Sequence, residues 1–293
     1  MNSKILITGA TGTTSQLAIK SLLNRGLKVR AMVRLFDQRS EQLEELGAEV
    51  VKGDFLDLKS LRTTLEGIER VYFCYPFKDG LTKAAGYFAK AAKESGVKLT
   101  VSMSQMNVHE GSTSPATQNH LIAEDILDWA NIGSVHIRPG LFAWNYLNMA
   151  GITVKAEGKF YFPNPDAKYT IIHPQDISDV VAELLISENY KSHIGKKYYL
   201  TGPRIFTAQE VVNELGDLLN RKIEYIEIPI EHWVEAMKRD PYVNDFLAKH
   251  LREFSKDIAN GFFNKSTDVV ETLTGHKPRE FKTYLKENID AFK

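Results

Sequence analysis

Residues 5–15 read ILITGATGTTS, and this stretch decides the fold. A strand-like apolar run passes directly into a glycine-containing turn, and helix-like spacing of apolar residues begins after it. Gly9 permits a tight turn, and Gly12 lets the backbone approach a pyrophosphate, which the amides and dipole of a helix N-terminus stabilise. Ser15 takes the third position of the dinucleotide fingerprint, where glycine or alanine is usual. The expected cofactor-binding residues of this turn are Gly9, Thr11, Gly12, Thr13 and Thr14.

Short β-branched runs alternate with longer helix-like segments through the first half of the chain. The expected strands are residues 4–8, 29–33, 50–51, 71–75, 99–102 and 135–137, with a further strand at 197–200. This alternation buries both faces of a parallel sheet. We therefore expect an α/β protein with a Rossmann-type doubly wound parallel sheet and a smaller, mainly helical C-terminal lobe.

The chain is expected to form two domains. Residues 1–149 together with about 170–203 are assigned to an NAD(P)-binding Rossmann domain. Residues from about 150 to 169 and 204–293 are assigned to a small substrate-binding lobe, because they combine aromatic, glycine and proline residues with helix-like segments. Residues 281–293 are expected to form an amphipathic helix.

Composition excludes several classes of protein. The 293 residues include 37 basic and 37 acidic side chains, so no overall field attracts nucleic acid or an anionic membrane. Cys74 is the single cysteine, which favours a reducing compartment. No apolar stretch approaches the roughly 18–20 residues that span a bilayer, and the N-terminus has no signal-peptide pattern. We expect a cytoplasmic protein without nucleic-acid or membrane partners, as a monomer or a homodimer.

The end of the second strand indicates which nicotinamide cofactor binds. An NAD site places an acid here for the ribose 2′-hydroxyl, whereas this chain has Arg34, whose guanidinium can form a fork onto a 2′-phosphate. This favours NADP(H) over NAD(H). Two alternatives stay open: Arg34 as a solvated loop residue, and Asp37 as a displaced ribose acid.

Two further strand ends supply candidates for the cofactor site. Asp54 and Phe55 follow the third strand, beside the expected place of adenine. Tyr75 and Pro76 leave the fourth strand at the same edge, where they are expected to border the nicotinamide ribose. Cys74 lies in an apolar run and is interpreted as a core residue.

At this point the sequence resembles the NmrA-like group of atypical short-chain dehydrogenases. The matching pieces are residues 9–12, 33–34, 53–57, 138–142 with Asn145, and 173–177, in the family's order over about two thirds of the chain. The resemblance implies an NAD(P)-binding domain with a small lobe that closes a substrate cleft. Members of the family include quinone, azo-dye and triphenylmethane reductases, and also non-catalytic NADPH-sensing regulators.

The helix that carries the catalytic pair in short-chain dehydrogenases departs from the family pattern. Catalytic members combine a serine after the fifth strand with a Tyr-x-x-x-Lys pair, which supplies a proton to a carbonyl oxygen. Ser102 and Ser104 fit the serine position. Alignment on Glu124 puts Ala116 at the tyrosine and His120 at the lysine, so the phenol acid is missing.

The missing acid narrows the choice of substrate. An ordinary ketone needs a proton as hydride arrives, whereas a quinone, an azo or iminium bond, or a triarylmethyl cation takes hydride into a delocalised or neutral product. The sequence therefore predicts an NAD(P)H-dependent reductase that acts on a small aromatic, conjugated or cationic acceptor. The alternative is a non-catalytic NADP(H)-sensing regulator or binding protein.

His120 and Ser102 are the candidate catalytic residues. The unperturbed pKa of histidine lies near the operating pH, so His120 is a possible proton donor to the product. The alternative is a surface histidine paired with Glu124 one helical turn later. These two residues lack a third ligand at a recognisable spacing, so no metal site is expected.

Aromatic residues after the sixth strand are the candidate substrate site. Phe142, Trp144 and Asn145 lie where the resemblance places the substrate loop, and flat rings stack against an aromatic acceptor. Residues 160–162 add further aromatic side chains. The alternative for each of these rings is packing within the lobe.

Overall fold

The computed structural model describes residues 4–293, except for the side chains of Lys4, Leu147 and Asn148. The chain forms two compact units. The first comprises residues up to Gln105, Asn119–Arg138 and Ile177–Tyr198. The second comprises Met106–Gln118, Pro139–Asp176 and Tyr199–Lys293. The second unit thus includes residues 106–118, 139–149, 170–176 and 199–203, which the sequence pattern assigned to the first domain.

A seven-stranded sheet of order β10-β6-β5-β4-β1-β2-β3 runs through the first unit and confirms the expected Rossmann-type fold. Its strands are β1 Lys4–Ile7, β2 Val29–Val33, β3 Glu49–Lys52, β4 Ile68–Phe73, β5 Leu99–Met103, β6 Ser134–Pro139 and β10 Lys197–Leu200. Neighbouring strands from β3 to β6 pair in parallel. The order reverses between β1 and β4, and open sheets bind ligands at the carboxyl end of such a switch point.

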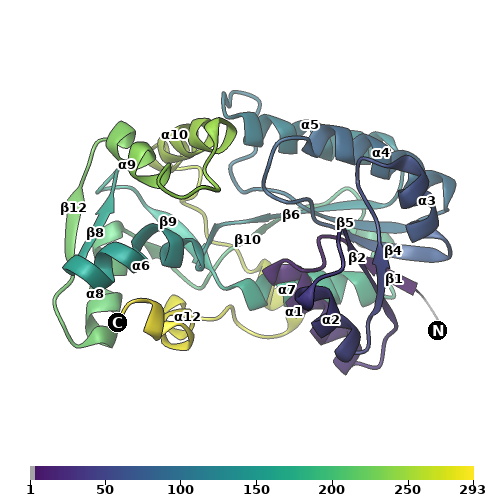
Figure 1. Ribbon diagram of the computed structural model, residues 1–293, viewed down its shortest axis with the longest axis horizontal. Coiled ribbons are helices and arrows are strands. Elements are labelled where there is room, and N and C mark those ends of the chain that lie inside the picture. The colour runs from purple at the N-terminus through teal and green to yellow at the C-terminus, as the bar shows by residue number, and fades with distance from the viewer. Residues whose placement is uncertain (1–3) are drawn as a thin grey trace. The chain divides into compact units, whose positions relative to one another are not determined.

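Helices cover both faces of this sheet (Figure 1), with α3, α4 and α5 on one face and α1, α2 and α7 on the other. Their bounds are α1 Thr13–Asn24, α2 Gln38–Glu45, α3 Leu58–Leu65, α4 Leu81–Glu94, α5 Pro115–Trp129 and α7 Pro174–Ile186. Within residues 4–293, none of the helices has the length and apolar character that crossing a membrane requires.

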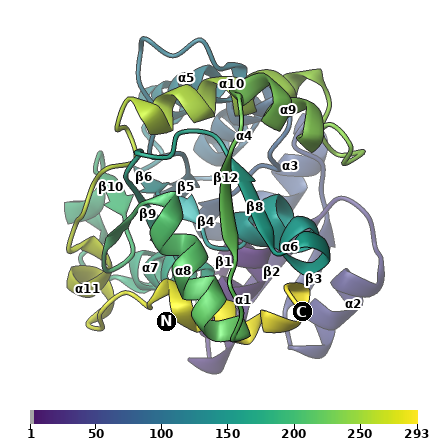
Figure 2. The same ribbon diagram turned by 90° about the vertical axis from the view of Figure 1, so that its left-hand side faces the viewer.

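The second unit is mainly helical but also contains two small sheets. Its helices are α6 Asn145–Glu157, α8 Ala208–Leu219, α9 Ile230–Met237, α10 Asp245–Ala259, α11 Val269–Thr274 and α12 Phe281–Glu287. One sheet has the order β11-β9-β7, with β7 Leu141–Phe142, β9 Tyr169–Ile172 and β11 Ile205–Phe206. The other pairs β8 (Lys159–Phe162) with β12 (Glu224–Glu227) in parallel, and this pair runs between α6 and α8 (Figure 2). The expected terminal helix is α12, followed by a short 3-10 turn at Ile289–Ala291.

Aromatic side chains form the core of the second unit. Phe160 and Phe162 alternate with half-buried residues along β8 and are themselves buried, and their rings stack at 5.7 Å between centroids. Trp233 packs edge-on against Phe162 at 5.4 Å. These two phenylalanine rings are therefore core residues of the unit and leave no aromatic face for a substrate.

A buried carboxylate fixes α5 in the first unit. Glu124 is 1% exposed and accepts hydrogen bonds from Arg138 at 2.5 and 2.9 Å and from the hydroxyl of Ser104 at 2.5 Å. Lys197 lies 3.2 Å from the same carboxylate. Burial raises the pKa of Glu124, but the hydrogen bonds from Arg138 and Ser104 and the neighbouring positive charge lower it to about 2. Glu124 is therefore ionised and joins α5 to β6, β10 and the end of β5.

We expect the Glu124→Ala variant to lose about 3–5 kcal/mol of unfolding free energy, because it leaves the buried guanidinium of Arg138 without its charge partner. Urea denaturation followed by circular dichroism measures this loss. Glu94→Ala is the matched control, since Glu94 forms exposed ion pairs with Arg62 and Lys90, and its loss should be much smaller. Equal losses in the two variants would show that the buried network does not hold α5.

Candidate dinucleotide and acceptor site

The glycine turn after β1 is locked against the end of β4. Gly9 has φ +55°, and a Cβ atom there would lie 2.6 Å from the carbonyl oxygen of Cys74. The hydroxyl of Thr8 donates to the carbonyl of Tyr72 at 3.0 Å and accepts from the Cys74 amide at 2.9 Å. Both the backbone conformation and the close approach therefore require glycine at position 9.

The N-terminus of α1 is open to an anion. Gly12 is the N-cap residue, so no side chain caps this helix end, and its first turn has no acidic residue. The backbone amides of the first turn are thus left for a ligand, with the positive end of the helix dipole behind them. Gly12 and Thr13 are exposed and Thr11 is half-buried.

Two side chains of the turn have structural partners. The Thr14 hydroxyl lies 3.3 Å from the Tyr72 hydroxyl and is buried, so Thr14 offers its backbone to a ligand more readily than its side chain. Ser15 is buried and donates to the carbonyl of Thr8 at 3.1 Å. This hydrogen bond explains how serine replaces glycine or alanine at the third fingerprint position without separating helix and strand.

The structure shows that the side chains of Arg34 and Asp37 differ in their hydrogen-bond and ion-pair partners. Asp37 is the N-cap residue of α2, accepts hydrogen bonds from the Arg39 and Ser40 amides, and pairs with the Arg39 guanidinium at 2.5 Å. The hydrogen bond from Arg39 lowers the pKa of Asp37. Arg34 is exposed, and within residues 4–293 its side chain has no hydrogen-bond or ion-pair partner. The carboxylate of Asp37 is thus engaged, whereas the guanidinium of Arg34 is available to a ligand.

The other cofactor candidates lie at the ends of β3 and β4 in the same unit. Asp54 is exposed and accepts from the Leu56 amide at 2.8 Å. The ring of Phe55 is 8% exposed and packs edge-on against Phe73 and Tyr75 at 5.3 and 5.4 Å, so its side chain belongs to the core. Tyr75 is half-buried and Pro76 is exposed, which leaves both accessible at this edge.

The two serine candidates have different surroundings. The hydroxyl of Ser104 donates to Glu124, as described above. Ser102, at the end of β5, is 3% exposed, and within the described part of the chain its hydroxyl has no hydrogen-bond partner. Ser102 is therefore the serine whose hydroxyl is left for a ligand.

His120 lies in an environment that disfavours its charge. It is half-buried on α5, and its ring stacks over Phe77 at 6.5 Å between centroids and 24° between planes. The pKa of His120 is lowered to about 4. Burial is the largest cause of this shift, Arg138 adds to it, and Glu124 opposes it. The imidazole is thus neutral at pH 7. Glu124 hydrogen-bonds to Arg138 and Ser104, so it does not serve as the one-turn partner of His120 that the sequence spacing suggested.

The lowered pKa of His120 makes folding stability depend on pH. Between pH 6.5 and about 4 the unfolded chain binds a proton that folded His120 does not, so the unfolding free energy falls as the pH falls through this window. Glu124 and Arg138 are the charged groups that act on His120. We expect the His120→Phe variant to lose less stability than the native chain between pH 7 and pH 4.5, measured by urea denaturation. Parallel losses would mean that His120 titrates normally.

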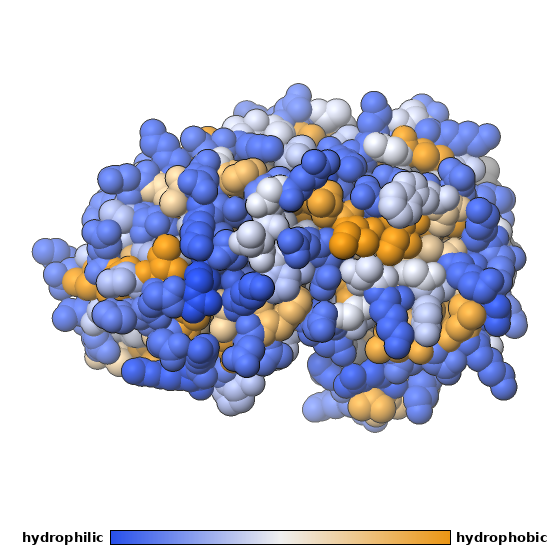
Figure 3. Space-filling model, turned by 90° about the horizontal axis from the view of Figure 1, so that it is seen from above, coloured by the Kyte–Doolittle hydropathy of each residue, from blue (hydrophilic) through white to orange (hydrophobic). Residues whose placement is uncertain are grey.

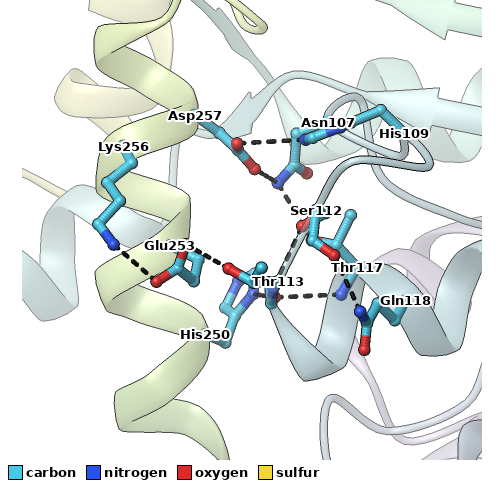
Figure 4. A network of polar contacts seen from close by, with 11 residues as sticks. Asn107, His109, Ser112, Thr113, Thr117, Gln118, His250, Glu253, Lys256 and Asp257 are labelled. Carbon is cyan, nitrogen blue, oxygen red and sulfur yellow. Dashed lines mark hydrogen bonds and ion pairs between the residues drawn. The ribbon is translucent and has the colours of Figure 1, made fainter.

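The loop of residues 106–114, which precedes α5, is anchored to α10 within the second unit (Figure 4). Asn107 donates to Asp257 at 2.8 Å, and His109 lies 3.3 Å from the same carboxylate. The Ser114 hydroxyl lies 2.8 Å from Nδ1 of His250. Because buried polar groups need partners, these contacts favour one conformation of the loop.

The candidate substrate residues belong to the second unit. Phe142 is half-buried at the end of β7, which pairs with β9. Trp144 is 40% exposed and Asn145, half-buried, begins α6. Trp144 is therefore the candidate ring with the largest accessible face among these three residues.

Comparison with known proteins agrees with these features. Residues 9–188 match a family model described as NAD(P)H-binding. An NAD(P)H azoreductase from Xenophilus azovorans is 25% identical over 290 residues, which are 98% of this chain and 99% of the relative.

Solved structures of two kinds share the fold. The NADPH-dependent quinone oxidoreductase QOR2 from Escherichia coli, complexed with NADPH, has a TM-score of 0.87 at 23% identity, covering 97% of this chain and 99% of that one. The negative transcriptional regulator Nmra in complex with NAD has a TM-score of 0.80 at 16% identity, covering 99% and 97%. The chain belongs to the NAD(P)H-binding family, as its resemblance to the NmrA-like atypical short-chain dehydrogenases implies.

Proposed function

We propose that this chain is an NADPH-dependent reductase that transfers hydride to a small conjugated or cationic acceptor, such as a quinone, an azo compound, an iminium ion or a triphenylmethane dye. The observation that carries the proposal is the pairing pattern after β2, where Arg34 is exposed and has no hydrogen-bond or ion-pair partner among the described residues, while Asp37 is paired with Arg39 and caps α2. A 2′-phosphate is complementary to a free guanidinium, because the two groups carry opposite charges and can form two parallel hydrogen bonds.

The cofactor would extend along the carboxyl edge of four neighbouring strands. The order β2, β1, β4, β5 places Arg34 at one end, the Gly9–Gly12 turn next, then Tyr75 with Pro76, and Ser102 at the other end. Neighbouring strands are about 4.8 Å apart, so these positions span roughly 14 Å. The turn amides would hold the pyrophosphate, Asp54 and the backbone of Phe55, which follow β3 beside β2, would border the adenine, and the Ser102 hydroxyl would donate to the nicotinamide or the acceptor.

The protonation states of Glu124 and His120, near the end of β5, support the proposal of an acceptor that needs no proton at the moment when hydride is transferred. Glu124 is ionised, with a pKa of about 2, and His120 is neutral, with a pKa of about 4. Both groups are therefore deprotonated at pH 7, so neither can donate a proton to the acceptor as hydride arrives. A bound nicotinamide supplies hydride, and a quinone becomes a hydroquinone once a proton from water follows. Phe142, Trp144 and Asn145 are the proposed acceptor-binding residues of the second unit.

We expect the purified chain to oxidise NADPH when menadione or an azo dye is added. Loss of absorbance at the nicotinamide band, with hydroquinone or cleaved dye as product, measures the reaction. A regulator of the NmrA kind would bind NADPH but consume none with any of these acceptors. That result would replace the reductase proposal with a cofactor-sensing function.

We expect Arg34→Ala to weaken NADPH binding by about 10- to 150-fold, the range for a lost hydrogen bond to a charged group, and to change NADH binding much less. Isothermal calorimetry with each cofactor measures both affinities. Arg39→Ala is the matched control, since Arg39 lies in the same segment but is already paired with Asp37. Equal weakening of NADPH and NADH by Arg34→Ala would reject the 2′-phosphate assignment.

A further inference from the structure

Two aromatic rings from distant segments meet in the first unit. Phe77 follows β4, and His120 lies in the second turn of α5, yet their rings are nearly parallel, with 24° between planes and 6.5 Å between centroids. Phe77 is 37% exposed and His120 is half-buried. The pair therefore retains solvent-accessible surface.

The position of this pair matches the acceptor end of the proposed cofactor path. Phe77 lies one residue beyond Pro76, at the carboxyl edge of β4. Helix α5 precedes β6, which is parallel to β5, so α5 runs back across the sheet and its first turns lie at the same edge. Ser102 is the penultimate residue of β5, the strand beside β4.

We propose that Phe77 and His120 form a stacking platform that binds the flat acceptor, with His120 acting as an aromatic surface and not as the proton donor. This inference rests on the proposed reductase function and names how its acceptor is recognised. Offset stacking on aromatic faces suits planar, electron-poor rings.

The charge state of His120 supports the platform. A neutral imidazole presents an uncharged face, which accepts both neutral quinones and cationic dyes, whereas an imidazolium would repel a cation. Glu124, the carboxylate nearest along α5, is held by Arg138 and Ser104, so the hydrogen bonds of this network do not tie the imidazole in place.

Substitutions that keep or remove each ring test the platform. We expect Phe77→Ala and His120→Ala each to raise the KM for menadione by about 2- to 10-fold with little change in kcat, because stacking is lost but no chemical step is. Phe77→Tyr and His120→Phe keep the ring and should stay within about 2-fold of the native KM. If His120 donates the proton, His120→Phe will instead lower kcat as much as His120→Ala does, and the proposal is overturned.

A smaller acceptor and a distant aromatic residue provide matched controls. 1,4-Benzoquinone has one ring where menadione has two fused rings, so its KM should change less in both alanine variants. Trp129 is 73% exposed at the last turn of α5. Figure 3 shows apolar side chains gathered on the solvent-facing surface over α4 and α5. Trp129→Ala should leave the KM for menadione unchanged.

Equilibrium binding separates failure of this inference from failure of the reductase proposal. Calorimetry measures the affinity of menadione for the complex with NADP⁺, which requires no turnover. If the native chain reduces no acceptor but the alanine variants bind menadione more weakly, the platform stands and the reductase proposal falls. If the native chain reduces menadione and the alanine variants keep its KM and affinity, or if menadione does not bind the native complex, the platform is rejected.

Discussion

The close approach of the β1 turn to the end of β4 is the constraint on which the candidate site depends. A single carbonyl oxygen, that of Cys74, occupies the space where a side chain at position 9 would lie. The Thr8 hydroxyl also joins these two strand ends through its hydrogen bonds to the backbone of Tyr72 and Cys74. Because β1 and β4 flank the switch point of the sheet, this contact sets where α1 begins and therefore where its amides point. The turn lies between the ends of β2 and β4 at the carboxyl edge of the sheet, so the candidate roles of the residues after these two strands depend on it.

A second constraint, the buried carboxylate of Glu124, determines the chemistry at the other end of that edge. Arg138 and Ser104 satisfy both of its oxygens, so the carboxylate remains charged inside the unit. The same burial that requires these partners also removes solvent from His120, one turn earlier, and lowers its pKa. Burial, and not the charge of Glu124, thereby deprives the site of a histidine acid, because Glu124 raises the pKa of His120 whereas burial and Arg138 lower it. This is consistent with acceptors whose reduced form is stable before it gains a proton.

The sequence predicted the local structure around the candidate cofactor residues better than the contacts around the candidate acceptor residues, and the reason is the range of the contacts. The glycine turn is a local pattern, and a strand, a turn and a helix within 20 residues are enough to identify it. The choice between Arg34 and Asp37 stayed open in the sequence, although the sequence contained the signal: Asp37 and Ser40 have the spacing of a capping box. By contrast, the spacing of His120 and Glu124 suggested a local pair, because it cannot reveal that Arg138 from β6 competes for the carboxylate. Phe55 and Phe77 illustrate the same limit, since neither residue type nor position tells which ring enters the core.

Local and long-range determinants also differ in how they tolerate change. The cofactor turn tolerates serine at its third position because one hydroxyl can satisfy one carbonyl nearby. The candidate acceptor end depends on long-range contacts: Phe77, which follows β4, contacts His120 of α5, and Arg138 of β6 affects the pKa of His120. Substitutions at this candidate acceptor end can therefore occur without changing the glycine turn. A quinone oxidoreductase and a transcriptional regulator share this fold, so the fold alone does not decide between the two functions.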